Sequence, residues 1–235
     1  MTDEQIMTTI AERLQAVRTQ IQLAAIEAGR YQHAVMLLAV SKAQSAESIR
    51  QAFLAGQRQF GENYLQEALD KQTELADLAI EWHFIGPIQS NKTQAIAQHF
   101  TWVHGVDRLK IAERLSQARP SHLPPLQICI QINVSHEPTK SGAAPQEVDA
   151  LVDAIIKLPS LQLRGLMAIP APSHDIALQH KQFRMVRDIY ESLTRQGFLL
   201  DTLSMGMSDD FLVAIQERAT IVRIGSAIFG ARAKP

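Results

Sequence analysis

The sequence contains only one cysteine, Cys129, among its 235 residues. It lies in the apolar run LQICIQINV, where a lone cysteine is typical of a small buried hydrophobic residue in a reducing compartment. No histidine pattern accompanies it, which argues against a catalytic thiol. Metal-ligand spacing is also missing from His83, His104, His174 and His180, so we predict no metal site.

The sequence also lacks an excess of either charge and any long hydrophobic run. The formal net charge is -1 and the pI is about 6.7, which argues against a general affinity for nucleic acid or anionic membranes. Apolar runs such as AVMLLAV fall far short of the ~20 residues of a membrane helix. The N-terminal stretch MTDEQIMTTIAERL is acidic and amphipathic, unlike a signal peptide. We therefore expect a cytoplasmic protein with no membrane or nucleic-acid partner.

No linker-like stretch rich in Pro, Gly or Ser divides the chain, so residues 1–235 are predicted to form one domain. Near the N-terminus an apolar residue recurs every three or four positions, which predicts an amphipathic helix within residues 1–30 that packs on the rest of the fold. The apolar stripe consists of Ile6, Ile10, Leu14, Val17, Ile21 and Ala24.

The rest of the chain alternates between short β-rich runs and helical stretches. Predicted strands cover residues 35–40, 59–61, 81–85, 102–105, 127–134, 162–167, 202–205 and 221–224. Predicted helices cover residues 46–55, 64–78, 92–99, 109–118, 145–158, 176–196 and 209–216. The clearest strands are continuous apolar runs, which favours a parallel sheet covered on both faces. The pattern predicts a single-domain (β/α)8 TIM barrel, with an open doubly wound sheet as the alternative.

A lysine follows the first predicted strand, in the stretch LLAVSKAQ. In a barrel, the carboxyl ends of the strands form the functional face, so Lys42 is expected at its mouth. Partial burial disfavours a charged amine, and a neutral amine can attack a carbonyl to form a Schiff base. Lys42 is therefore a candidate covalent anchor, although a strand-end lysine can also simply face solvent.

The last two strand ends offer a phosphate site. Loops in these positions of a barrel frequently bind phosphate. Gly225 would let the backbone approach a phosphate, while Ser208 and Ser226 could donate hydroxyl hydrogen bonds. The stretch SDD also matches a helix N-cap, which is compatible with phosphate binding only if Asp209 and Asp210 point away.

Three further residues attract attention because they are polar and lie in or beside strands. Arg223 lies inside the last strand, where a cation needs a salt bridge or a ligand. Asn63 follows the second strand and could contact a ligand or cap the helix that begins at Tyr64. His83, in EWHFIG, is expected to pack or hydrogen-bond near a strand.

Seven motifs together resemble a known family. In order they are LLAVSK, GQRQFGENYLQEALDK, EWHFIGPIQSNK, INVSHEPTKSG, RGLMAIPAP, LSMGMSDD and VRIGSAIFGAR. This set, from about Leu37 to Arg232, resembles the YggS/PROSC family of pyridoxal 5′-phosphate (PLP) homeostasis proteins. The resemblance implies a fold like the N-terminal domain of alanine racemase.

The resemblance also implies roles for individual residues. Lys42 would form the internal aldimine with PLP, Arg223 would face the pyridine nitrogen, and Asn63 would line the cofactor. The phosphate would be held by Ser208, Gly225, Ser226 and the backbone of Met207. Lys140, in EPTKSG, matches a family lysine that could be a secondary aldehyde target, and the role of Lys234 stays open. The stretch SKAQS departs from the family pattern, because the second lysine usually found there is absent.

We predict a PLP carrier that supports intracellular PLP and amino-acid homeostasis without robust catalysis. A PLP ring stabilises a carbanion best when a carboxylate keeps its nitrogen protonated, and an arginine there leaves the nitrogen neutral. In alanine racemases a tyrosine from a second domain serves one face of the substrate, and we expect no such domain after residue 235. The alternatives are a PLP-dependent amino-acid racemase with a one-domain site and a Schiff-base aldolase. PLP-dependent apo-enzymes are the expected recipients, and the chain is expected to be a monomer.

Overall fold

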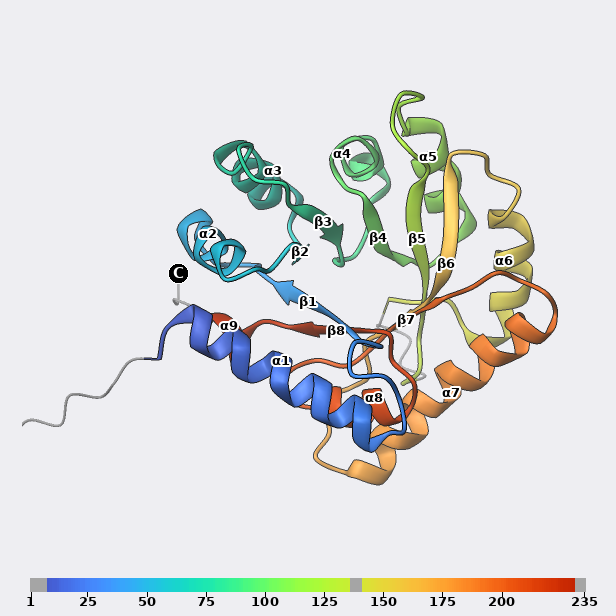
Figure 1. Ribbon diagram of the computed structural model, residues 1–235. Helices are drawn as coiled ribbons and strands as arrows, with labels where there is room; N and C mark the ends of the chain where they lie inside the picture. The colour runs from blue at the N-terminus through green and yellow to red at the C-terminus, as the bar shows by residue number, and fades with distance from the viewer. Residues whose placement is uncertain (1–7, 136–140, 231–235) are drawn as a thin grey trace, which may run out of the picture.

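The computed structural model describes residues 8–135 and 141–230, which form a closed parallel β-barrel. The strands follow one another around the barrel in chain order, and β1 pairs with β8 to close it (Figure 1). They are β1 (Met36–Val40), β2 (Gln59–Glu62), β3 (Glu81–Phe84), β4 (Trp102–Val106), β5 (Leu126–Ile132), β6 (Leu161–Ala168), β7 (Thr202–Ser204) and β8 (Ile221–Ile224). The predicted barrel is confirmed, and the open sheet is excluded.

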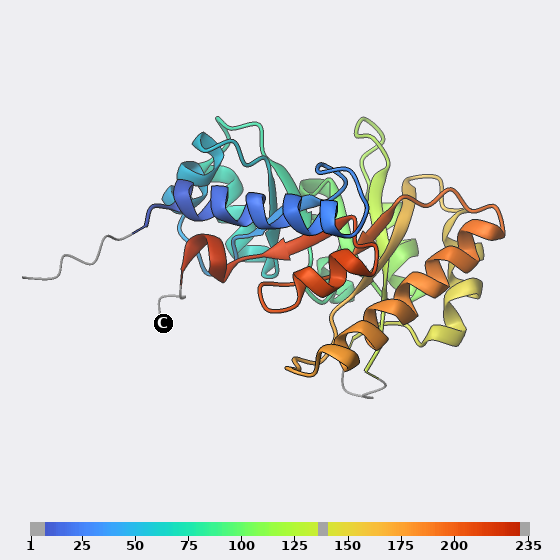
Figure 2. The ribbon, with the colours of Figure 1, turned by 60° about the horizontal axis from the view of Figure 1, so that its bottom comes forward.

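Helices follow the strands and cover the outside of the barrel (Figures 1 and 2). They are α2 (Ala46–Leu54), α3 (Leu65–Glu74), α4 (Thr93–His99), α5 (Leu109–Ala118), α6 (Val148–Ile155), α7 (Ile176–Arg195), α8 (Phe211–Gln216) and α9 (Ser226–Phe229). Two short 3-10 turns, η1 (Ser90–Lys92) and η2 (Pro145–Glu147), precede α4 and α6. None of the helices in the described ranges is long and apolar enough to cross a membrane.

The N-terminal helix α1 (Ile10–Glu27) packs against α2, α8 and α9. Figure 2 shows α8 and α9 beside it. Thr9 and Glu12 form a reciprocal capping box at its start. Near that end Arg13 donates to the carbonyl of Ile228 at 2.6 Å, and just beyond the other end Arg30 donates to the carbonyl of Ala219 at 2.7 Å. The predicted apolar stripe is buried from Ile10 onward, whereas Ile6 lies outside the described residues.

Buried side chains of the strands pack in separate clusters on the two faces of the barrel wall. Alternate strand residues such as Leu37 and Ala39 pack in the large core between strands and helices. Leu38 instead packs with Ile85 and Ile221 in a separate cluster inside the barrel. A second inner cluster contains Trp102, Cys129 and Met167. Cys129 is fully buried and burial raises its pKa, so the prediction of a structural cysteine is confirmed.

Candidate functional site

The polar strand-end residues meet at one mouth of the barrel because parallel strands all end there. Lys42 is the second residue after β1, and β1 pairs with β8 through Leu38 and Arg223. Gly225 follows β8 and lies against Val40, since an added Cβ would sit 3.0 Å from the Val40 carbonyl oxygen. The lysine and the glycine loop therefore share one edge of the mouth.

Lys42 lies in a tightly bonded turn and is half-buried. The preceding Ser41 is fully buried, and its N–H donates to the carbonyl of Gly61 at 3.0 Å. The following Ala43 has a positive φ of 58°, a conformation that residues with a Cβ seldom adopt. The backbone around Lys42 is thus held in an unusual geometry, which turns the chain away from the strand direction at this lysine.

The two serines of the predicted phosphate site lie together. The Ser226 hydroxyl donates to Ser208 Oγ at 3.1 Å, although the two residues are 18 positions apart. Ser226 is exposed and Ser208 is half-buried, so both remain accessible at the mouth. Two hydroxyls at this distance could both contact one anionic group.

The Met207 amide, predicted to bind phosphate, already has a partner. It donates to Asp210 Oδ1 at 2.6 Å, and burial raises the pKa of that half-buried carboxyl. Asp210 thereby closes the turn that leads into α8, which begins at Phe211 rather than at residue 209. Asp209 is exposed. Asp210 occupies the N-cap position of α8, but its carboxylate bonds to the preceding Met207 amide and makes no capping hydrogen bond to the helix.

Arg223 is almost fully buried, and its guanidinium reaches the ends of β7 and β6. Its Nη1 donates to the Ser204 carbonyl at 2.5 Å and to Ser204 Oγ at 2.8 Å, while Nη2 donates to the Ala168 carbonyl at 2.8 Å. Burial lowers its pKa to about 10, which leaves it a cation at neutral pH. These bonds use three of the five guanidinium N–H donors, and the described residues leave the other two for a ligand.

A chain of hydrogen bonds continues from Arg223 through the barrel. Ser204 Oγ lies 2.8 Å from His104 Nδ1, and His104 Nε2 lies 2.9 Å from His83 Nδ1. Ser204 Oγ accepts from Arg223, which can only donate, and His104 Nδ1 is the remaining acceptor for the serine hydrogen among the described contacts. His104 must then carry its proton on Nε2 and donate to His83. Burial lowers the pKa of both histidines, which keeps them neutral.

The chain ends near the opposite mouth of the barrel, at Glu81. His83 Nε2 faces Glu81 Oε1 at 3.6 Å, a contact longer than a hydrogen bond. His83, together with donors from Gln59 and Trp102, lowers the pKa of Glu81 to about 2 against the effect of burial. The expectation that His83 bonds near a strand is thus confirmed, and the residues that the sequence analysis missed are Ser204, His104 and Glu81. Polar side chains at inward-facing strand positions were the available signal.

Asn63 lies at the same mouth and does not cap the following helix. Tyr64 occupies the N-cap position of α3, and Asn63 Oδ1 is buried without a partner among the described residues. The side chain borders a cavity of about 200 Å³. The cavity is lined by Asn63, Ile85, Pro87, Gln131, Ser141 and Ile169, all of which lie at or beyond strand ends. The ligand-contact alternative for Asn63 is therefore favoured.

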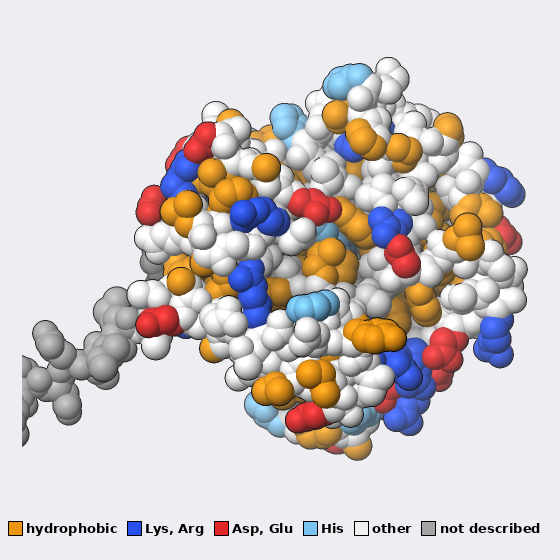
Figure 3. All heavy atoms as spheres, viewed as in Figure 1, with side chains coloured by type: hydrophobic (Ala, Val, Ile, Leu, Met, Phe, Trp, Pro, Cys, Tyr) orange, Lys and Arg blue, Asp and Glu red, His pale blue; other side chains and the backbone are white. Residues whose placement is uncertain are grey.

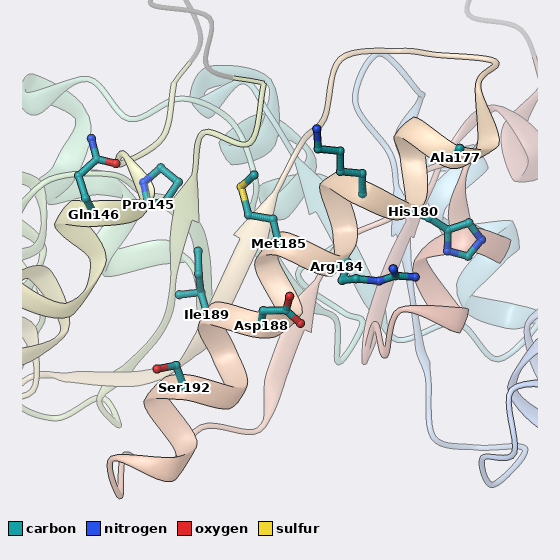
Figure 4. Close-up of a pocket in the computed structure, with 10 residues that line it drawn as sticks. Pro145, Gln146, Ala177, His180, Arg184, Met185, Asp188, Ile189 and Ser192 are labelled. Carbon is teal, nitrogen blue, oxygen red and sulfur yellow. The ribbon is translucent and has the colours of Figure 1, made fainter.

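A larger cavity, of about 940 Å³, lies away from the mouth (Figure 4). One face of α7, from Ala177 to Ser192, forms most of it, with Pro145 and Gln146 opposite. Its lining shares no residue with the predicted site. Its size therefore does not identify the functional site.

No group of three or more metal-ligating side chains occurs within the described ranges. On the face shown in Figure 3, basic and acidic side chains are interspersed rather than gathered into a patch of one sign. Lys140, predicted as a secondary aldehyde target, and Lys234, whose role stays open, both fall outside the described residues.

Comparisons with known proteins agree with this geometry. Residues 13–233 match the family model described as alanine racemase, N-terminal domain. The pyridoxal phosphate homeostasis protein of Pseudomonas aeruginosa is 59% identical over 226 residues, covering 96% of this chain and 97% of the relative. This chain belongs to the pyridoxal phosphate homeostasis protein family. The Escherichia coli protein of that name is 50% identical, with 96% and 98% covered.

Solved structures of a related protein support the same family assignment. PipY of Synechococcus elongatus is 38% identical, and the match to each of its two structures covers 94% of this chain and 100% of the PipY chain. The structure without PLP has a TM-score of 0.86, and the one with PLP bound has a TM-score of 0.84. The family predicted from the sequence motifs is confirmed.

Proposed function

We propose that this chain binds PLP through a Schiff base on Lys42 and carries it, without robust catalysis, to PLP-dependent apo-enzymes. The observation that carries this proposal is the shared edge of Lys42, Arg223 and the Gly225–Ser226 loop. Relatives of nearly the same length are named pyridoxal phosphate homeostasis proteins, and one solved relative has PLP bound.

The residues at the mouth suit the chemistry of PLP. PLP, when bound, would supply an aldehyde, and a lysine amine could condense with it to form a C=N bond with release of water. Lys42 offers the amine, and the hydroxyls of Ser208 and Ser226 suit a phosphate. Gly225 leaves room for the backbone to approach that phosphate. The Met207 amide would help only after release from Asp210, so the serines and the glycine carry the phosphate site in this proposal.

Arg223 supports a carrier rather than a catalyst. Its free N–H groups can donate to a ring nitrogen, but a guanidinium cannot accept a proton from one. The ring nitrogen would therefore stay unprotonated and withdraw electrons weakly. Asn63 Oδ1, which lacks a partner among the described residues, would accept a hydrogen bond from a polar edge of the ring.

A racemase would need a second acid or base on the far face of its substrate. The chain has three tyrosines. Tyr31 precedes β1 and Tyr190 donates to the carbonyl of Leu200 before β7, which puts both toward the opposite end of the barrel. Tyr64 follows β2 on the mouth side, but it is 59% exposed. Among the three tyrosines, Tyr64 is therefore the candidate second base for the racemase alternative.

We propose that the protein is a monomer, as expected from the sequence. A cytoplasmic location stays a prediction that rests on the single cysteine, the N-terminal stretch unlike a signal peptide and the short apolar runs. Lys140 is proposed as a secondary aldehyde target on the family resemblance alone, and the role of Lys234 stays open.

The deciding experiment is borohydride reduction followed by peptide mass spectrometry. We expect a coloured protein whose visible band disappears on reduction, with the pyridoxyl group on Lys42. An adduct found chiefly on Lys71 or Lys92 would contradict the assignment. A colourless protein that nevertheless cleaves a phosphorylated aldol substrate would favour the aldolase alternative.

A further inference from the structure

A buried lysine lies beneath the turn that carries Lys42. Lys71, on α3, is only 5% exposed. Its Nζ donates to the Ser41 carbonyl at 2.7 Å, to Glu62 Oε1 at 2.8 Å and to Glu67 Oε1. An ammonium group has three hydrogens, so these three acceptors satisfy it completely.

The same cluster grips the chain on both sides of Lys42. On the N-terminal side, Ser41 donates from its hydroxyl to Glu62 Oε1 at 2.6 Å and accepts from Lys71 through its carbonyl. On the C-terminal side, the Ala43 N–H donates to Glu67 Oε1 at 2.6 Å. Both neighbours of Lys42 are therefore tied to one set of charged groups on β2 and α3.

Stability alone is a weak explanation for such a cluster. Two carboxylates share one ammonium here, and burial raises the pKa of Glu62. Taking ions out of water costs free energy that their mutual attraction often fails to offset, and well-packed apolar residues can do as well. The cluster does bond to Ala43, which has a left-handed conformation, and adds to the Gln44 N–H bond to the Ser41 carbonyl that closes the same turn.

We propose that Lys71, Glu62 and Glu67 are positioning residues that hold the turn around Lys42 and so aim its amine at an incoming aldehyde. This inference rests on the proposed function of Lys42. It adds a charged cluster outside the mouth that fixes the conformation of the turn around Lys42. A misaligned amine reacts slowly even when the ligand is bound, because a displacement of about 1 Å can cost on the order of 100-fold in rate.

The test separates covalent reaction from phosphate binding. Pyridoxine 5′-phosphate has an alcohol in place of the aldehyde, so it can bind but cannot form the C=N bond. We expect Glu67→Leu to slow reaction of the protein with PLP by roughly 10- to 100-fold, followed at the visible band. The affinity for pyridoxine 5′-phosphate should stay within about twofold of the wild-type value, since the substitution removes no hydrogen bond to the ligand.

Glu67 is the first residue to change because its side chain is 30% exposed, so its loss should leave the fold intact. Glu67→Gln should restore the rate, since an amide oxygen still accepts from the Ala43 N–H. Glu74→Leu, at an exposed position on the same helix, is the matched control. Lys71→Met should repeat the effect if its thermal unfolding is cooperative.

Two results would overturn the positioning role. One is an unchanged reaction rate in Glu67→Leu, and the other is an equal loss for PLP and pyridoxine 5′-phosphate. A wild-type protein that gives no reduced adduct on Lys42 would instead overturn the proposed function itself.

Discussion

The Nη1 nitrogen of Arg223 lies 2.8 Å from Ser204 Oγ, and this bond orients the hydrogen-bonded series Ser204, His104 and His83. The guanidinium can only donate, and His104 Nδ1 is the remaining described acceptor for the serine hydroxyl, so the hydroxyl donates onward to His104. A cation at the proposed cofactor site is therefore held by a neutral chain that reaches toward the opposite mouth.

Removing the link in this chain should destabilise the protein. Ser204→Ala leaves His104 Nδ1 without its donor and Arg223 without one acceptor, both in a buried position. We expect the free energy of unfolding to fall by about 1–3 kcal/mol, measured by urea denaturation. Ser121→Ala, at an exposed loop position, should change it by less than about 0.5 kcal/mol. A Ser204 variant as stable as the Ser121 variant would contradict the role of the chain.

The buried histidines should make stability depend on pH in a defined direction. Burial lowers the pKa of His83 and His104 in the folded state, so the unfolded chain binds protons first as pH falls. Stability is therefore fully present above the unfolded pKa of about 6.5 and is lost as pH falls below it, by about 1.4 kcal/mol per pH unit for each histidine.

The measurement is urea denaturation from pH 7.5 to pH 5. His104→Gln should flatten the slope in that range, whereas His122→Gln removes an exposed histidine and serves as the control. An unchanged slope in His104→Gln would mean that other groups cause the loss of stability between pH 7.5 and pH 5.

Lys42 should matter for the cofactor and little for the fold. Lys42→Ala removes the amine proposed as the main target of the aldehyde, so the visible band should vanish. The residue lies at the rim and is half-buried, so the unfolding free energy should change by less than about 1 kcal/mol. Absorption spectra of the wild-type protein and Lys42→Ala check the band, and melting curves of both check the stability. A persistent band would place the Schiff base on another residue.

The serine pair should be sensitive to charge. Ser226→Ala removes one hydroxyl hydrogen bond to a charged phosphate, worth roughly 1.5–3 kcal/mol. Ser226→Asp adds repulsion between like charges and should weaken PLP binding much further. Equal affinities of the two variants in a PLP titration would move the phosphate away from Ser208 and Ser226.

Catalysis should be negligible even with PLP fully bound. Deuterium exchange and chirality inversion of L-amino acids should stay far below the rate of about 1 per second that is ordinary for enzymes. Slow exchange without inversion would fit an amine that serves one face only. Rapid inversion would overturn the carrier proposal, and loss of that inversion in Tyr64→Phe would identify the second base.

The barrel itself could be predicted from the sequence because its signals are local. Continuous apolar runs indicate strands covered on both faces, and their alternation with amphipathic stretches specifies the helices. Predicted strand bounds differ from the observed ones by at most two residues. Once the strands are parallel, every residue that follows one must lie at the same mouth, which is why Lys42, Ser208 and Ser226 could be grouped from the sequence.

Other features depend on contacts between distant parts of the chain. Glu67 and Lys71 have the spacing of an ordinary surface ion pair on a helix, and only the packing of α3 against β2 brings Glu62 and the Lys42 turn to them. The sequence predicts that the Met207 amide binds phosphate, but in the turn before α8 this amide donates to Asp210 Oδ1.

The sequence by itself determined where the strands lie and which reactive groups follow them, because strand patterning and the common direction of the strands are properties of short segments. Only the tertiary structure decided which buried polar groups meet. His104 and Ser204 are 100 residues apart and touch because the barrel closes, and closure fixes the distances, the burial and the proton direction together.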